Sequence, residues 1–206
     1  MKLRTTVLVG ASTSIAASLA LLIGWTAVAA EPKRRACVGR TPATCVRELR
    51  FLDTTSPCEP LSPGIATVEG NTYRLRGQVT RDRSVNIDGF PGSEGWILST
   101  VNSDVDLTTL AGTSWGTFVK LFDNVAEATV YGTYTGVVEG GVFSGRATGR
   151  ATGPFEGYVF QASIRQTPLG QPPSGASCPG GTSTEFGHTV DATLTIDHAS
   201  NVRNGR

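Results

Sequence analysis

Apolar and polar residues alternate along much of the chain after residue 65. In the clearest case, 189–197, every second residue is apolar: Val190, Ala192, Leu194 and Ile196. A period of two places successive side chains on opposite faces of a β-strand, one of them buried. Further strands, bounded by turn signals, are expected at 73–79, 96–110, 113–122, 128–139, 142–152 and 155–166. No segment has convincing helical periodicity, so the sequence predicts an all-β protein.

The expected strands are joined mostly by short connections. Gly140 and Gly141, for example, indicate a tight hairpin between 128–139 and 142–152. Short connections favour an antiparallel meander, and an open meander leaves two unpaired edges. We therefore predict that residues 65–198 close into a barrel of seven or eight strands, with a two-sheet β-sandwich as the alternative.

Glycines recur at every fourth position in the centre of this region. They form two runs, Gly132, Gly136 and Gly140, then Gly141, Gly145, Gly149, Gly153 and Gly157. A spacing of four keeps each run on one face, and glycine weakens a strand unless its missing side chain serves a purpose. We predict that these glycines lie on the inner wall of a barrel, where they permit sharp bending and leave interior space. The alternative is a Thr/Gly-rich face exposed to solvent.

The first 30 residues are typical of an export signal. Lys2 and Arg4 precede an uncharged stretch that ends in small residues at Ala30. We expect cleavage near Ala30 and a secreted or extracytoplasmic protein. The alternative is an uncleaved membrane anchor, although serines and threonines dilute the hydrophobicity of this stretch. No second apolar run is long enough to span a bilayer, so no membrane span is expected in the mature chain.

Charge gives no sign of a polyanionic partner. The chain of 206 residues has a formal net charge of +1, and removal of residues 1–30 changes it to −1 because two basic residues and no acidic ones are lost. This balance excludes an electrostatic design for nucleic acid. It also excludes a disordered acidic or basic chain, since charged residues are only 17% of the total. We expect no nucleic acid partner.

The cysteines agree with export. All four, Cys37, Cys45, Cys58 and Cys178, follow the expected signal, and an even number in an oxidising compartment indicates two disulfides. We predict the pairs Cys37–Cys45 and Cys58–Cys178, the second closing a large loop. A zinc site is disfavoured because no Cys-x-x-Cys pair occurs, and we predict neither a metal nor a cofactor. Residues 31–64 are expected to be an irregular, disulfide-held lead-in, in which 45–52 forms either one helical turn or a strand. Residues 199–206 are expected to be a flexible tail.

Standard catalytic motifs are absent from the sequence, so candidate residues come from strand faces. Arg146 and Arg150 share a face and would hold a carboxylate or phosphate if that face pointed inward. The opposite face carries Phe143 and Ala147 and looks more like a core face, which favours two solvated arginines. His188 has the chemistry of a general base, but its position is more typical of an ordinary surface residue.

Aromatic and acidic residues supply the other candidates. Glu156 and Tyr158 share a strand face and would form a polar pair in a cavity, with a rim position beside a packed ring as the alternative. Trp115 and Tyr134 would line an apolar cavity or fill a plain core. The candidate ligand-binding residues are therefore Trp115, Tyr134, Arg146, Arg150, Glu156 and Tyr158. No residue is assigned a catalytic role.

The run from Gly149 to Gly157, together with 141–145 before it, resembles the glycine-punctuated strands of allene oxide cyclase-like and dirigent-like barrels. In those families a pattern Thr-Gly-x-Ala-x-Gly-x-Phe-x-Gly opens a late barrel strand. The resemblance covers a minority of the mature chain. It implies an eight-stranded barrel, often dimeric or trimeric, with an apolar cavity that shapes a reactive or hydrophobic small molecule. No catalytic residue carries over, and the disulfide-held lead-in and the loop 167–187 depart from the family pattern.

Three functions fit these observations. We expect an exported barrel that binds a hydrophobic small molecule or an envelope partner without catalysis. The first alternative is a cavity enzyme of the allene oxide cyclase-like or dirigent-like type, in which shape and desolvation act on a small hydrophobic substrate. The second is a structural or adhesion module of the cell envelope. A polar pair facing an open cavity would favour the enzyme, and a filled interior with a large exposed apolar patch would favour the structural module. A homo-oligomer is a further expectation.

Overall fold

The computed structural model describes residues 48–168, 178 and 186–196. Nine strands follow one another in this part of the chain: β1 (Glu48–Ser62), β2 (Ile65–Glu69), β3 (Thr72–Gly89), β4 (Gly95–Asp106), β5 (Ala111–Phe122), β6 (Thr129–Glu139), β7 (Val142–Thr152), β8 (Tyr158–Gln166) and β9 (His188–Ile196). Two 3-10 turns, η2 (Pro91–Ser93) and η3 (Gly153–Phe155), lie in the connections after β3 and β7. None of the described residues forms an α-helix, so the predicted all-β class is confirmed.

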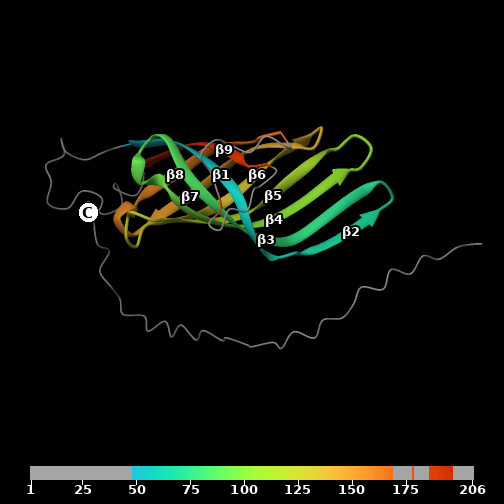
Figure 1. Cartoon of the computed structure of the whole chain (residues 1–206), viewed down its shortest axis with the longest axis horizontal. Coiled ribbons are helices and arrows are strands. Elements are labelled where there is room, and N and C mark those ends of the chain that lie inside the picture. Colours follow the sequence, from blue (N-terminus) through green and yellow to red (C-terminus); the bar gives the residue numbers. More distant parts are fainter. Residues whose placement is uncertain (1–47, 169–177, 179–185, 197–206) are drawn as a thin grey trace, which may run out of the picture. The chain divides into compact units, whose positions relative to one another are not determined.

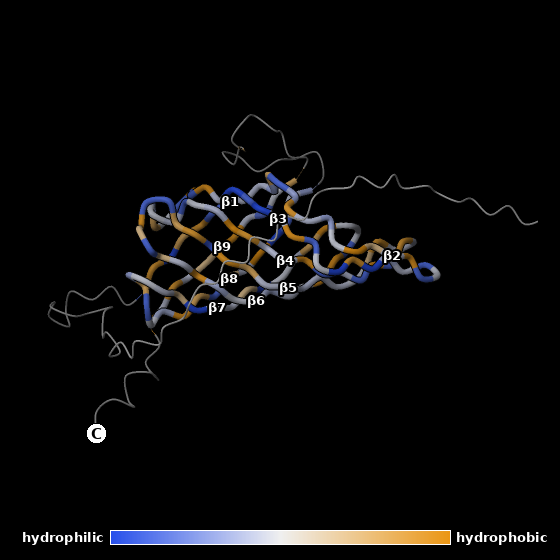
Figure 2. Tube along the Cα trace, turned by 90° about the horizontal axis from the view of Figure 1, so that it is seen from below, coloured by the Kyte–Doolittle hydropathy of each residue, from blue (hydrophilic) through white to orange (hydrophobic). Residues whose placement is uncertain are grey.

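Eight of the strands close into an antiparallel barrel (Figure 1). They lie in the order β1-β9-β8-β7-β6-β5-β4-β3, and β3 pairs back with β1. This closure removes the open edges that a meander would leave, and it confirms the predicted barrel rather than the two-sheet sandwich. Within the described region β2 pairs with β3 alone. Because β3 pairs with β4 over the same stretch, the β2–β3 hairpin lies beside the hairpin of β4 and β5 (Figure 2).

Buried and exposed residues alternate along the strands, which sorts side chains between the barrel interior and its outer surface. Apolar and polar residues are interspersed along the strands in Figure 2. In β9, Val190, Ala192 and Leu194 are buried, whereas the intervening Asp191 is exposed. The inward side chains meet in one core cluster, whose larger members include Phe51, Phe118, Phe122, Val130, Tyr158 and Phe160. The apolar face that the sequence predicted for 189–197 is therefore the inner face of the wall.

Strand β1 is the main departure from the sequence prediction. Residues 31–64 were expected to be irregular, but Glu48–Ser62 forms a wall strand paired with both β3 and β9. Alternation is hidden here because four consecutive polar residues, Asp53 to Ser56, are all buried. The pairing with β3 also shifts register near Pro57 and Pro60, which lets the strand accommodate prolines.

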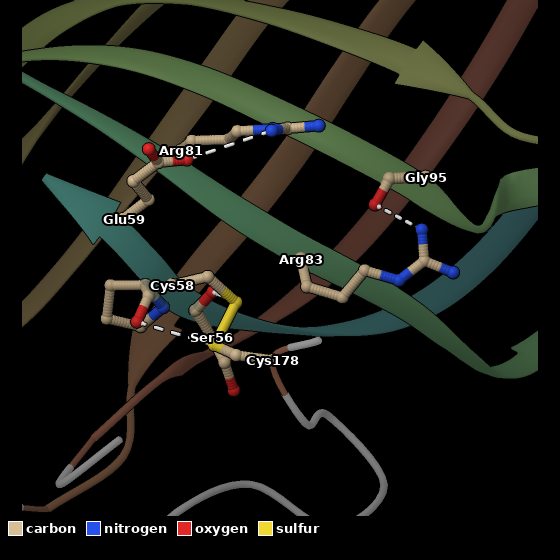
Figure 3. Close-up of a disulfide and its surroundings, with 8 residues drawn as sticks. Ser56, Cys58, Glu59, Arg81, Arg83, Gly95 and Cys178 are labelled. Carbon is tan, nitrogen blue, oxygen red and sulfur yellow. Dashed lines mark hydrogen bonds and ion pairs between the residues drawn. A yellow bond between two sulfur atoms is a disulfide. The ribbon is translucent and has the colours of Figure 1, made fainter. Parts of the chain in front are cut away.

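The predicted disulfide between Cys58 and Cys178 is confirmed (Figure 3). It links β1 to a residue that lies before β9 in the chain, across a sequence separation of 120 residues. On the same stretch of β1, Glu59 forms an ion pair with Arg81 of β3 on the outer surface (Figure 3). The predicted Cys37–Cys45 pair, the export signal at 1–30 and the tail at 199–206 lie outside the described residues.

The glycine runs divide into two groups. Gly132 and Gly136 on β6 pair directly with Gly149 and Gly145 on β7. They alternate with exposed residues and so share the inner face with buried side chains such as Val130. A Cβ added to Gly132 would lie 2.0 Å from the carbonyl oxygen of Thr148, because the two backbones approach closely at this bend. The inner-wall prediction is confirmed for these four. The others, Gly140, Gly141, Gly153 and Gly157, lie in turns with positive φ.

Candidate functional site

The interior of the barrel holds a cavity of about 310 Å³, lined by residues from all eight wall strands. We call it the barrel cavity. Its apolar lining includes Phe51, Phe118 and Phe160, with ring centroids 6.3 Å apart for Phe51–Phe160 and 5.4 Å apart for Phe118–Phe160. Uncharged polar side chains are spaced along the strands, among them Gln78, Thr80, Ser99, Ser103, Ser114 and Gln166. A largely apolar cavity with a few placed polar groups is the usual construction of a small-molecule site.

A buried ion pair between Lys120 of β5 and Asp53 of β1 lies beside the barrel cavity. Lys120 Nζ is 2.7 Å from Asp53 Oδ2, and the two side chains are 3% and 1% exposed. Ser84 of β3 accepts a hydrogen bond from Lys120 Nζ at 2.8 Å and donates one to Asp53 Oδ2 at 2.8 Å. Burial lowers the pKa of Lys120, and the charge of Asp53 opposes that effect. Together with Ser84, the ion pair thus links β1, β3 and β5 through the barrel interior.

The second carboxylate oxygen of Asp53 is also occupied. Ser93 Oγ donates to Asp53 Oδ1 at 2.6 Å, and Asn86 Nδ2 approaches the same oxygen at 3.3 Å. Asp53 is therefore surrounded by four donors from β3, η2 and β5. This network neutralises Lys120 within the protein and leaves neither charge available to a ligand.

Asp82 of β3 lines the barrel cavity and, unlike Asp53, is not fully hydrogen-bonded by the described residues. The residue is 8% exposed, and its Oδ1 has no hydrogen-bond partner among the described residues. Its register partners on β1 and β4 are Pro57 and Ile97, whose side chains offer no donor. Burial raises the pKa of Asp82 to about 6, against a smaller opposing effect of a hydrogen bond with Thr80. The site therefore contains a carboxyl group with a pKa of about 6, one of whose oxygens lacks a hydrogen-bond donor among the described residues.

His188 at the start of β9 also lines the barrel cavity, so the sequence interpretation of an ordinary surface residue is wrong. Its ring packs edge to face against Phe143 and Phe186, with centroid distances of 6.3 Å and 6.1 Å. Its Nδ1 is 3.4 Å from the hydroxyl oxygen of Thr55 on β1. Burial lowers the pKa of His188 to about 4, so the imidazole is neutral at physiological pH.

Tyr134 of β6 crosses the inner surface of the neighbouring strand β5. It pairs with Gly116, where an added Cβ would lie 2.9 Å from Tyr134 Cε1, and the missing side chain lets the ring pass. The hydroxyl then donates to the carbonyl oxygen of Thr100 on β4 at 3.3 Å. Burial raises the pKa of Tyr134 to about 12, and the charge of Asp82 adds to this effect. The phenol is a neutral hydrogen-bonding group of the cavity lining.

Of the six candidate residues named from the sequence, Tyr134 alone lines the barrel cavity. Trp115 lies on the outer face of β5, where the guanidinium of Arg76 stacks on it at 5.0 Å from the ring centroid. Tyr158 is 6% exposed and packs in the core cluster, with its ring centroid 6.0 Å from that of Phe155. Glu156 is exposed in the turn before β8. The predicted polar pair of Glu156 and Tyr158 is therefore not found in the cavity.

Arg146 and Arg150 of β7 are exposed on the outer face, while Phe143 and Ala147 of the same strand are buried. This is the register in which the sequence favoured two solvated arginines. Arg146 does border a shallow depression on the outer wall, together with Arg165 of β8. The face of β7 that carries the two arginines thus points away from the barrel cavity.

Asp82 and Lys120 line the barrel cavity together with His188, but the sequence analysis did not identify either of them as a candidate. Lys120 follows the alternation of 113–122, on the same face as Phe118, and that signal could have placed it inside. Asp82 gave no such signal, because Thr80 and Ser84 on its face are also polar.

Comparison of the chain with protein families, curated proteins and solved structures found no match in any of the three. The resemblance to allene oxide cyclase-like and dirigent-like barrels therefore stays a prediction. In the described segments, no helix has the length and apolar character needed to cross a bilayer. The same segments contain no cluster of three or more His, Cys, Asp or Glu residues arranged to hold a metal ion.

Proposed function

We propose that the protein is an exported barrel that binds a small, mostly apolar molecule in its interior without turning it over. The observation that carries this proposal is the barrel cavity itself. Its volume of about 310 Å³ lies at the lower end of the range of small-molecule sites, roughly 300 to 1,000 Å³. A cavity of about 150 Å³ accepts one benzene ring, so a molecule of one or two rings suits this space.

Two further features support the proposal. A barrel with a purely structural role would be expected to fill its interior to the density of an ordinary core, whereas this barrel keeps a space lined by side chains of mixed polarity. The disulfide between Cys58 and Cys178 is typical of an oxidising compartment, which agrees with the export signal expected at residues 1–30.

The proposal is tested by a substitution that reduces the volume of the barrel cavity. Ala147 of β7 is 3% exposed and lines the cavity, whereas the next residue, Thr148, points outward. In calorimetric titrations with phenylbutanol, we expect Ala147→Met to weaken binding about tenfold or more, because the longer side chain takes up ligand space. Thr148→Met is the matched control and should bind as the wild type does.

Two readouts accompany this titration. Circular dichroism and the thermal midpoint establish that both variants are folded. Native mass spectrometry of the exported protein shows whether a small molecule is retained from the secreting host. Equal binding by wild type and Ala147→Met, or equal losses in the two variants, would contradict the proposal, because the ligand would then lie elsewhere.

A cavity enzyme is the second candidate, and one observation favours it. Asp82, Tyr134 and His188 all face the same space, and Asp82 can gain or lose a proton near pH 6. Mass spectrometry of the bound molecule after prolonged incubation separates the two functions. A binding protein returns its ligand unchanged, whereas an enzyme converts it at a rate that Asp82→Asn lowers.

A further inference from the structure

The barrel cavity holds one charge that the described residues do not balance. Among the described residues, four titratable side chains line it: Asp82, Lys120, Tyr134 and His188. The charge of Lys120 is matched by Asp53 at 2.7 Å. Tyr134 and His188 are neutral at physiological pH, because burial opposes the charged form of each. The carboxylate of Asp82 therefore faces the cavity without a counter-charge among the described lining residues.

The missing partner of Asp82 is a hydrogen-bond donor as well as a charge. Its Oδ1 is buried and unbonded within the described part of the chain. An unbonded buried acceptor is costly, and the cost is larger when the acceptor is ionised. Pro57 and Ile97, its register partners, cannot supply the donor from their side chains. A ligand that brings an N–H group and a positive charge would satisfy both needs in one contact.

On the basis of the proposed function, we propose that the barrel cavity selects an apolar molecule carrying one ammonium group, which donates a hydrogen bond to the Asp82 carboxylate. The apolar part of such a molecule would pack against the aromatic lining, which includes Phe51, Phe118, Phe143, Phe160 and Phe186. Aromatic rings tolerate a cation better than aliphatic walls do, because the ring faces are partly negative. An anionic ligand would be repelled by Asp82.

The affinity for the amine should depend on pH in one direction. Asp82 binds an ammonium group best when ionised, and its pKa is raised to about 6. Lowering the pH from about 8 to about 5 should therefore weaken amine binding about tenfold. The groups that face Asp82 do not reverse this trend. Lys120 stays paired with Asp53, Tyr134 stays neutral, and His188 gains a proton only near pH 4.

The test uses three probes of the same shape: phenylbutylamine, phenylbutanol and phenylbutanoate. Calorimetric titration of the wild type near pH 8 should give an affinity for the amine at least about tenfold above that for the alcohol. The carboxylate should bind more weakly than either. Asp82→Asn should reduce amine affinity to about that of the alcohol while retaining alcohol binding, which also shows that the variant is folded.

Glu59→Gln is the matched control. Glu59 lies on β1 near the strand position opposite Asp82, but it is exposed and paired with Arg81 outside the wall at 3.7 Å. Its replacement should leave the preference for the amine unchanged. Equal affinity of the wild type for alcohol and amine, or an unaltered preference in Asp82→Asn, overturns the assignment of an amine ligand and leaves the proposed function intact. If none of the three probes binds, both the amine assignment and the proposed small-molecule function are wrong.

Discussion

At the scale of single residues, the contrast between the two buried aspartates is informative. Asp53 accepts hydrogen bonds from Ser84, Ser93 and Lys120, so its charge is compensated where it lies. Asp82 is almost as buried, yet one of its oxygens is unbonded among the described residues. A compensated charge contributes to the fold, whereas an uncompensated one lowers stability and is typical of a binding site. The two residues therefore have separate roles.

The first prediction concerns the free energy of unfolding of ligand-free protein. Because the folded-state pKa of Asp82 is about 6 rather than the usual 3.8, the folded protein holds this proton more tightly than the unfolded chain does. The resulting stability is complete below pH 3.8 and is lost as the pH rises through about 6, a difference of roughly 3 kcal/mol. The free energy of unfolding of Asp82→Asn lacks this dependence on pH. As the pH rises from below 3.8 to above 6, the variant should therefore become more stable relative to wild type by the same roughly 3 kcal/mol.

Urea denaturation at a series of pH values measures this difference. Glu59→Gln, which removes an exposed carboxylate paired with Arg81, should follow the wild-type profile to within about 1 kcal/mol. A difference between wild type and Asp82→Asn that does not change with pH would show that Asp82 keeps its ordinary pKa.

At the scale of elements, strict alternation made most of the wall predictable. Strands β4 to β9 could be located because their inward residues are largely apolar or glycine and their connections carry turn signals. Strand β1 could not be recognised, because its buried residues Asp53 to Ser56 are polar and its prolines suggested a loop. In β3, regular alternation within the expected strand 73–79 would place Val79 on the face of Leu75. A bulge between Leu75 and Gln78 reverses the alternation, so Gln78 lines the cavity instead.

The same limit applies to the candidate site. Tyr134 could be found because it is aromatic and lies in a clearly alternating strand. Asp82 lies beyond the β3 bulge, among polar neighbours, and only the closed barrel places it in the same cavity lining as Tyr134 and His188. The sequence thus predicted a cavity and its wall, but not the charged groups inside it.

The second prediction tests the link between strands β1 and β5. Replacing either Lys120 by Met or Asp53 by Asn leaves its partner buried and uncompensated, and each change should cost about 3 to 5 kcal/mol in the free energy of unfolding. The double variant should lose less than the sum of the two single losses, since neither charge is then left alone. Urea denaturation of the four proteins forms the cycle. Additive losses would mean that the ion pair contributes no coupling.

At the scale of the whole molecule, closure of the barrel includes the pairing of β1 with β9. These are the first and last strands of the wall, so their contact closes the sheet. The disulfide from Cys58 to Cys178 connects β1 to a residue that precedes β9 in the chain. A crosslink over a separation of 120 residues restricts the unfolded chain strongly and brings the closing partners together.

The third prediction follows from this closure. Replacing Cys58 and Cys178 together by Ser should lower the free energy of unfolding by about 4 to 5 kcal/mol, as expected for a crosslink that closes a loop of more than 100 residues. Native-state hydrogen exchange should show where stability is lost, because local unfolding should begin near the position of the removed disulfide. The amides that pair β1 with β9 should lose more protection than those that pair β5 with β6. Uniform loss across both pairs would show that the crosslink stabilises the barrel globally, with no special role at its closing seam.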